Sequence, residues 1–187
     1  MKKWNTLASE YLYKTPFGNL RKDTCQLSNG IVIKDYYVNE YSDWVNAVVI
    51  TEDSKIVLVK QYRHAGGDFF LEIPAGKIEE NETHEEGILR EVREETGFSS
   101  KAAPVKLGEF MVNPATQTNK VITYLIQDAF KETEQTLDYT EEIDVKLVDF
   151  NDFGGLIGAG EIKTQLFTAS AYFMAKNHIE GQVPKDG

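Results

Sequence analysis

Several features on which other proteins depend are scarce or missing in these 187 residues. Cys25 is the only cysteine, so no disulfide can form within the chain, and a single thiol is typical of a reducing cytoplasm. No second cysteine and no histidine stand near it, so we expect Cys25 to be structural. No apolar run has the length of a membrane span, and the opening residues, MKKWNTLASEYLYK, lack the apolar core of a signal peptide. We therefore expect a cytoplasmic protein without membrane contacts.

Basic residues are also fewer than acidic residues. Lys and Arg total 20 against 30 Asp and Glu, which gives a formal net charge of −10. Binding to the phosphate backbone of DNA or RNA needs a basic surface, so nucleic acid is not an expected partner. A small anionic ligand is compatible with this charge, because a bound metal ion inverts the local field. The length and the 41% hydrophobic content fit one domain with a small appendage.

The acidic motif, residues 76–98 (GKIEENETHEEGILREVREETGF), is the densest group of carboxylates in the chain. If it is helical, Glu91 and Glu95 lie on one face with Glu94 beside them, and like charges at that spacing repel. Two interpretations are open. The motif could be a solvated acidic surface, as most charge runs are. Alternatively, a divalent cation such as Mg²⁺ or Mn²⁺ offsets the repulsion, and Mg²⁺ sites usually also recruit substrate phosphates.

The pattern of apolar residues predicts mixed α/β structure. Residues 10–38 are expected to form a small antiparallel sheet with a hairpin at Ser28-Asn29-Gly30, too small to be stable without a partner surface. Thr83 and Glu86 predict a capping box at the start of a helix that ends at Gly97. The buried stripe of this helix is expected to consist of Ile88, Leu89 and Val92. Further strands are expected at residues 44–50, 55–62, 69–73, 106–112, 121–127 and 143–150.

The end of the chain predicts one more helix. Residues 164–178 have Leu166 and Phe173 on one apolar side, and residues 181–187 are expected to fray. The glycine-rich stretch 154–160 lacks the Gly-Lys-Ser/Thr ending of a phosphate-binding P-loop, so that interpretation is rejected.

Two further positions suggest ligand contacts. Arg63 stands at the end of a predicted strand, where it is either a surface ion pair or an anion clamp, since a guanidinium fork matches phosphate geometry. Gly76 permits backbone geometry that other residues resist, so the carbonyl of Ala75 could point at a ligand. The polar loop at residues 113–119 is of the kind that carries specificity.

The acidic motif resembles the signature of the Nudix hydrolases at every defining position: Gly76, Glu82, Arg90, Glu91, Val92, Glu94, Glu95, Gly97 and Phe98. Residues 43–46, 59–64 and 71–76, together with Pro114 downstream, are similar to the branch that cleaves ADP-ribose and nucleoside diphosphate sugars. This resemblance implies a Nudix α/β/α sandwich around a mixed β-sheet at residues 43–187. It also implies a small N-terminal antiparallel β-sheet at residues 1–42 that serves homodimer formation.

The resemblance further implies which residues act. The metal ligands for Mg²⁺, or Mn²⁺, would be the Ala75 carbonyl and the carboxylates of Glu91, Glu94 and Glu95. A glutamate of the late loop, which lies just before the strand that begins at Ile143, would activate water or bind another metal, and we expect Glu142 rather than Glu141 in this role. Arg90 would orient the carboxylates, and Glu82 would be structural or support the ligands. Arg63 and Pro114 would contact substrate, and Tyr36 or Tyr37 would either stack on the base or simply pack on a strand.

The expected reaction is metal-dependent hydrolysis of the diphosphate bond of a nucleoside diphosphate sugar to a nucleoside monophosphate and a sugar phosphate. Two alternatives stay open: a Nudix hydrolase of dinucleoside polyphosphates or nucleoside triphosphates, and a non-catalytic Nudix module that senses nucleotides. The arginines that the branch carries upstream of Trp44 are missing, because residues 37–43 contain no Arg. The sequence therefore does not identify ADP-ribose as the preferred substrate, and GDP-mannose or another nucleoside diphosphate sugar is an equally open expectation.

Overall fold

The computed structural model describes residues 2–182, which divide into two compact units. Of the described residues, the N-terminal unit comprises residues 2–43 and 110–121, and the larger unit comprises residues 44–109 and 122–182. The first unit thus contains the expected N-terminal sheet together with a later loop that the sequence alone assigns to the main domain. No helix within the described residues has the length and apolar content needed to cross a membrane.

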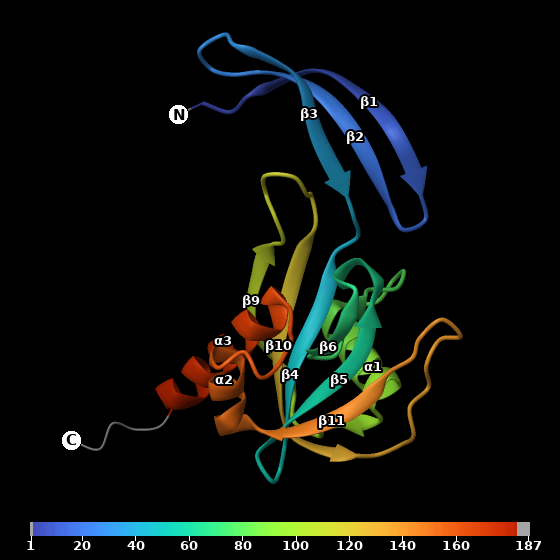
Figure 1. Cartoon of the computed structure of the whole chain (residues 1–187), viewed down its shortest axis with the longest axis vertical. Helices are drawn as coiled ribbons and strands as arrows, with labels where there is room; N and C mark the ends of the chain where they lie inside the picture. The colour runs from blue at the N-terminus through green and yellow to red at the C-terminus, as the bar shows by residue number, and fades with distance from the viewer. Residues whose placement is uncertain (1, 183–187) are drawn as a thin grey trace, which may run out of the picture. The chain divides into compact units, whose positions relative to one another are not determined.

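The N-terminal unit is built on a three-stranded antiparallel sheet with the order β1 (Asn5–Thr15), β2 (Gly18–Gln26) and β3 (Val32–Glu40) (Figure 1). The predicted hairpin is present: the N–H of Gly30 donates to the carbonyl of Leu27, and Gly30 has a φ of +88°, which suits glycine. Cys25 is buried in β2, as expected of a structural residue.

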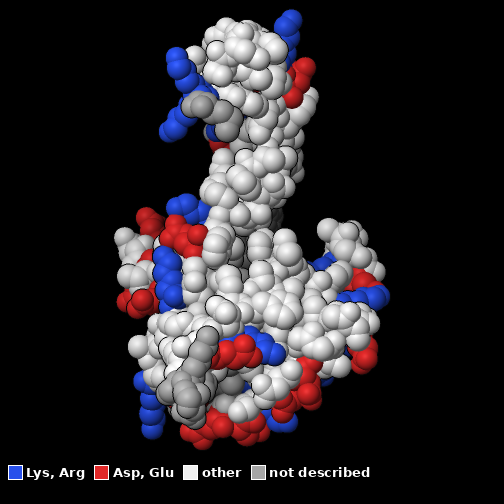
Figure 2. Space-filling view, turned by 90° about the vertical axis from the view of Figure 1, so that its left-hand side faces the viewer, with Lys and Arg blue, Asp and Glu red and all other residues white. Residues whose placement is uncertain are grey.

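Much of this small sheet is apolar yet exposed. Every residue of β1 before Thr15 is exposed, and most of the visible surface of the sheet is uncharged in Figure 2. The large exposed apolar residues on or next to β1 are Trp4, Leu7, Tyr11, Leu12, Tyr13 and Phe17. Contiguous exposed apolar surface of this kind marks a binding face, and a small sheet without a covered face is not stable in water.

The larger unit is organised around a sheet with the order β11 (Asp144–Asp149), β5 (Lys55–Arg63), β4 (Trp44–Thr51), β10 (Lys120–Lys131) and β8 (Phe98–Ser99). Three more strands join this path. β6 (Asp68–Glu72) pairs with β5, β7 (Ala75–Lys77) pairs with β4, and β9 (Val105–Met111) pairs with β10. A 3₁₀ turn, η1 (His64–Gly66), connects β5 to β6. All the strands predicted from the sequence are present, within a few residues of their expected ends.

Helices cover both faces of this sheet, which makes the α/β/α sandwich that the sequence predicts (Figure 1). α1 (His84–Thr96) packs on the face that bears Val45, Ala47 and Val49 of β4. α2 (Phe150–Gly158) and α3 (Leu166–Gln182) pack on the opposite face, against Val48 and Ile50. Successive side chains of a strand point to opposite faces, so a strand buried on both sides needs consecutive apolar residues, which β4 has at residues 47–50.

Both ends of α1 lie where the sequence predicts them, at the capping box of Thr83 and Glu86 and at Gly97. Thr83 accepts a hydrogen bond from the N–H of Glu86, whose side chain accepts one from the N–H of Thr83, so the capping box is formed. Gly97 ends the helix with a φ of +69°. A Cβ at this position would overlap the carbonyl oxygen of Thr133, so both backbone conformation and space require glycine here.

The sequence-based prediction of which helix residues are buried is partly wrong. In α1, Leu89 is 37% exposed, whereas Glu95 is only 5% exposed, because Ile88, Val92 and Glu95 share the spacing that faces the sheet. In α3 the buried residues are Thr168, Ala171, Tyr172 and Ala175, while Leu166 and Phe173 are exposed. Leu166 and Phe173 therefore lie off the face of α3 that packs on the sheet, a face that contains the large ring of Tyr172 as well as smaller residues.

The remaining expectations concern the last part of the chain. The glycine-rich stretch falls mainly in α2, where a Cβ at Gly154 would crowd the ring of Tyr172. α3 extends to Gln182, so the first two residues of the expected tail are helical. The rest of that tail, residues 183–187, lies outside the described residues.

Candidate active site

Gly76 of β7 and Glu91 of α1 meet at the centre of the acidic motif. β7 pairs with β4 so that Gly76 lies opposite Val45, on the face of the sheet that α1 covers. A Cβ at residue 76 would overlap the carboxylate of Glu91. Glycine is therefore required for steric reasons, since it lets a charged helix side chain rest directly on the strand backbone.

Glu95 lies one helical turn further on and is buried. Its Oε2 accepts a hydrogen bond of 3.0 Å from the N–H of Ala75. Burial raises the pKa of Glu95 to about 8, the hydrogen bond from Ala75 acts in the opposite direction, and the charges of Glu91 and Glu141 raise it further. Burial also raises the pKa of Glu91, against the influence of Arg90. Two carboxyl groups are thus held where a neighbouring positive charge would strongly favour their ionised forms.

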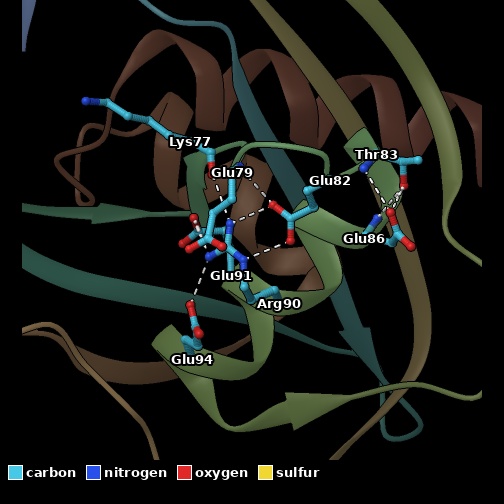
Figure 3. A network of polar contacts seen from close by, with 8 residues as sticks. All are labelled: Lys77, Glu79, Glu82, Thr83, Glu86, Arg90, Glu91 and Glu94. Carbon is cyan, nitrogen blue, oxygen red and sulfur yellow. Dashed lines mark hydrogen bonds and ion pairs between the residues drawn. The ribbon is translucent and has the colours of Figure 1, made fainter.

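Arg90 organises the carboxylates around it (Figure 3). Its Nε and Nη2 donate to the two oxygens of Glu82, each at 2.9 Å, and Nη2 also donates to the carbonyl of Lys77 at 3.0 Å. Its Nη1 donates to Glu91 Oε1 and Glu94 Oε2, both at 3.0 Å. All five N–H groups of the guanidinium have acceptors, so Arg90 has no donor left for a substrate. This supports the orienting role predicted for Arg90 and the supporting role predicted for Glu82.

The donor set around Ala75 and Gly76 fits a hard divalent cation. Arg90 contacts only one oxygen of Glu91 and one of Glu94, which leaves the second oxygen of each side chain outside that contact. Carboxylate and backbone oxygens are the ligands that Mg²⁺ and Mn²⁺ prefer. Within residues 2–182, no three His, Cys, Asp or Glu side chains are already arranged around one point as metal ligands would be. The chemistry of the donors, rather than a preformed cage, is what matches a metal.

Arg63 and Glu95 lie close enough for the charge of each to influence the pKa of the other. The Nε of Arg63 donates to Glu72 Oε1 at 3.0 Å and its Nη2 to Glu72 Oε2 at 2.5 Å. This pairing, with the charges of Glu95 and Glu141, raises the pKa of Arg63. The Glu72 side chain is 2% exposed, whereas that of Arg63 is 40% exposed. The buried Glu72 therefore holds Arg63 in place, while part of the Arg63 side chain stays exposed, where an anion could reach it.

The late-loop residue Glu141 influences the charges of this site. Its charge contributes to raising the pKa of Glu91, Glu95 and Arg63. The side chains of Glu141 and Glu142 are both exposed, just before β11, and Glu141 accepts a hydrogen bond from the N–H of Asp138 at 3.1 Å. Which of the two glutamates acts on water stays a prediction, and the influence of Glu141 on these three groups is the reason to test it alongside Glu142.

The other predicted substrate contacts lie in the N-terminal unit. The hydroxyl of Tyr36 donates to the carbonyl of Ala115 at 2.6 Å, which joins β3 to the 113–119 loop that contains Pro114. Trp4 packs edge-on against the same ring. Tyr37 is 49% exposed, as expected of the neighbouring position on a strand. Tyr36 thus has a packing role within its unit, while Tyr37 offers a free aromatic ring.

Two residues of the site were not predicted from the sequence. Glu72 is the one charged residue in the apolar segment at residues 69–73, and a buried carboxylate needs a partner, so its position was an available signal. Gln135 donates through its side-chain amide to the carbonyl of Glu95 at 2.6 Å. Nothing in the polar stretch around Gln135 distinguishes it, because its partner lies forty residues earlier in the chain.

Comparisons with known proteins agree with this geometry. Residues 42–169 match the NUDIX domain family, and residues 4–39 match the nucleoside diphosphate sugar hydrolase N-terminal domain. The chain is 29% identical over 179 residues to an ADP-ribose pyrophosphatase of Bacillus subtilis (strain 168), covering 95% of this chain and 96% of that protein. It is 30% identical over 141 residues to a methanol dehydrogenase activator of Bacillus methanolicus, with 75% of each chain covered.

A solved structure has the same fold. The crystal structure of an ADP compounds hydrolase superposes with a TM-score of 0.84 at 20% identity and covers 98% of this chain and 97% of that one. Nudix hydrolases generally use a divalent metal, in agreement with the oxygen donors found here. The motif at residues 76–98 lies inside the matched domain, and the small sheet coincides with the N-terminal match. The chain therefore belongs to the Nudix hydrolase family, as an enzyme of the pyrophosphatase type.

Proposed function

We propose that this enzyme hydrolyses the diphosphate bond of a nucleoside diphosphate sugar and releases a nucleoside monophosphate and a sugar phosphate. The observation that carries the proposal is that Glu91 and Glu95 meet the backbone of Gly76 and Ala75, while Arg90 joins Glu94 to Glu91. Mutually repelling carboxylates held in this way are costly unless a cation and an anionic substrate offset them. The N-terminal match to nucleoside diphosphate sugar hydrolases supports the substrate class.

The metal would be Mg²⁺, with Mn²⁺ as an alternative, held by the Ala75 carbonyl and by Glu91, Glu94 and Glu95. When bound, it supplies positive charge that offsets the phosphoryl oxygens and favours deprotonation of the attacking water. Arg90 keeps Glu91 and Glu94 in place through one oxygen each. The hydrogen bond from the N–H of Ala75 fixes the orientation of Glu95 in the same way.

Proton transfer would be the role of Glu141. A water molecule attacks one phosphorus, a new P–O bond forms, and the anhydride P–O bond breaks, while Glu141 accepts the proton of the water. A positioned general base of this kind typically contributes about 10²–10⁴-fold to the rate. Comparing Glu141→Gln with Glu142→Gln decides between the two glutamates, because only loss of the true base should lower kcat by that amount.

Each unit contains residues for which we propose a contact with substrate. Arg63, anchored by the buried Glu72, would hold the diphosphate or the terminal sugar. In the N-terminal unit, Tyr37 has the exposed ring that stacking on a base requires, and Pro114 would help to shape the specificity loop. Tyr36 would fix that loop through its hydrogen bond to Ala115.

The enzyme would act as a homodimer. The exposed apolar residues of β1, which include Leu7, Tyr11 and Leu12, have the composition of a subunit interface, and a second copy of the same sheet would cover them. A cytoplasmic location, expected from the cysteine content, stays a prediction.

A product-resolved assay tests the proposal. The panel contains ADP-ribose, GDP-mannose, UDP-glucose and diadenosine polyphosphates, each with Mg²⁺ or Mn²⁺, in water enriched with ¹⁸O. Cleavage of at least one sugar nucleotide to two monophosphates, with ¹⁸O in one of them, supports the proposal and identifies the phosphorus attacked. Cleavage of dinucleoside polyphosphates alone would point to the alternative enzyme class. Measurable binding without hydrolysis of any compound would point to a nucleotide-sensing module.

A further inference from the structure

The C-terminal end of α1 is held by one short segment that follows β10. The carbonyls of its last turn would otherwise lack partners, as at the end of any helix. The N–H of Thr136 donates to the carbonyl of Glu94 at 2.9 Å, and Lys131 Nζ donates to that of Thr96 at 2.9 Å. The carbonyl of Gly97 accepts from the N–H groups of Glu132 and Thr133, at 2.9 and 3.1 Å. The segment at residues 131–136 is thus fixed to the helix that carries the acidic motif.

Gln135 does more than the other members of this segment, because it reaches two different parts of the chain. Its Nε2 donates to the carbonyl of Glu95 at 2.6 Å and to the carbonyl of Ile143 at 3.2 Å. An amide nitrogen carries two hydrogens, so both bonds can form at once. Ile143 is buried, and it follows Glu142 directly at the entrance to β11. Gln135 therefore links the backbone of a buried motif carboxylate to the far end of the late loop.

The late loop, residues 136–142, lies between these two attachment points and contains Glu141. The first residue of the loop, Thr136, donates its N–H to the carbonyl of Glu94. Ile143, directly after the loop, accepts a hydrogen bond from the side chain of Gln135. Inside the loop, a turn joins the N–H of Glu141 to the carbonyl of Asp138 at 2.9 Å, and Glu141 itself is exposed. Fixing both ends restricts where an exposed glutamate can lie, so the side-chain bond from Gln135 to Ile143 limits the positions open to Glu141.

We propose that Gln135 is a positioning residue for hydrolysis: its two hydrogen bonds hold the late loop so that Glu141 faces the carboxylates of α1. This inference rests on the function proposed above and adds a residue that the Nudix signature does not contain. It differs from a simple helix cap, because a cap needs only the bond to Glu95, whereas positioning needs the bond to Ile143 as well.

The chain offers a matched control for this distinction. Lys131 also donates a single side-chain bond to the last turn of α1, but it has no bond to the late loop. Gln135→Met and Lys131→Met each remove one cap from neighbouring carbonyls while keeping an unbranched side chain. Both variants are expected to show similarly small losses in melting temperature.

Kinetics and amide hydrogen exchange should then separate the two variants. We expect Gln135→Met to lower kcat by about 10–100-fold with little change in KM, the usual scale for loss of a supporting hydrogen bond. We expect Lys131→Met to keep the kcat of the parent. Amides of residues 137–144 should exchange faster in Gln135→Met alone, with the exchange of α1 unchanged. In the Glu141→Gln background, adding Gln135→Met should lower kcat no further, since its effect passes through Glu141.

Several results would overturn the proposal. They are parent-like kcat and exchange in Gln135→Met, equal losses in Gln135→Met and Lys131→Met, and a full additional loss in the Glu141→Gln background. The exchange measurement stands on its own if the parent cleaves no sugar nucleotide. In that case the proposed function fails, while faster exchange of the late loop would still support the link made by Gln135 and unchanged exchange would reject it.

Discussion

The carboxylate of Glu91 occupies the space that a side chain on residue 76 would fill. Gly76 and Glu91 of the acidic motif therefore form one contact between β7 and α1. Their sequence separation is fixed by geometry: the chain must leave the strand, form the capping box and complete two helical turns before a carboxylate returns to the strand.

Replacing Gly76 by alanine should displace Glu91. We expect kcat/KM to fall by about 100-fold, since a shift of about 1 Å in a positioned group can cost that much. Gly155→Ala is the control, because a Cβ at that position in α2 meets nothing within 4 Å. Metal-dependent kinetics and the melting temperature of both variants check this, and parent-like activity in Gly76→Ala would show that the contact is dispensable.

Replacing Arg90 by lysine keeps the charge and removes the planar fork. One ammonium cannot reproduce five donors directed at Glu82, Glu91, Glu94 and Lys77. We expect a loss of activity of about 10–100-fold, with a higher metal concentration needed for half-maximal rate. Arg93→Lys, on the same helix with a side chain that is 60% exposed, should behave like the parent. Equal behaviour of the two variants would contradict the orienting role.

The Arg63–Glu72 pair allows a structural role to be separated from a substrate role. Arg63→Met leaves the buried Glu72 without its partner and should reduce the free energy of unfolding by about 2 kcal/mol. Adding Glu72→Leu removes the uncompensated carboxylate, so stability should largely return. If Arg63 holds the diphosphate, KM stays raised in the double variant, as urea unfolding and steady-state kinetics would show. Recovery of both stability and KM would mean that Arg63 serves only Glu72.

The exposed apolar face of β1 predicts a dimer in solution. Leu7 is 55% exposed on that strand, and Leu147 of β11 is 48% exposed in the larger unit. Sedimentation velocity should find a dimer for the parent and for Leu147→Glu, and a shift towards monomer for Leu7→Glu, because a buried charge destabilises an apolar interface. A monomeric parent would contradict the proposed assembly.

The sequence was most informative where structure is determined locally. The unbroken apolar runs of β4 and β5, the Asn29-Gly30 turn and the Thr83–Glu86 capping box each depend on neighbouring residues. The buried faces of the helices were harder, because they depend on what lies opposite. Glu95 is buried although it carries a carboxyl group, since the N–H of Ala75 donates a hydrogen bond to it. Phe173 is exposed because Tyr172 and Ala171, rather than Phe173, lie on the face of α3 that packs on the sheet.

The candidate site divides in the same way. The acidic motif has a fixed spacing that can be read directly, and Arg90 and Glu82 follow from it. The contacts of Glu72 and Gln135 cross between elements distant in sequence, and the coupling of Glu141 to Glu91 and Glu95 depends on how the late loop returns to α1. Spacing within one segment carries no information about such contacts.

The central claim is that the acidic motif holds a metal ion that drives hydrolysis of a nucleoside diphosphate sugar. Its most direct test is the rate of sugar nucleotide cleavage by the parent and by Glu95→Gln, each measured with Mg²⁺ and after chelation. We predict that chelation abolishes the parent activity and that restored Mg²⁺ recovers it. With saturating Mg²⁺, Glu95→Gln should be slower by at least about 10²-fold. A Glu95→Gln variant as fast as the parent, or a parent rate indifferent to chelation, would contradict the claim.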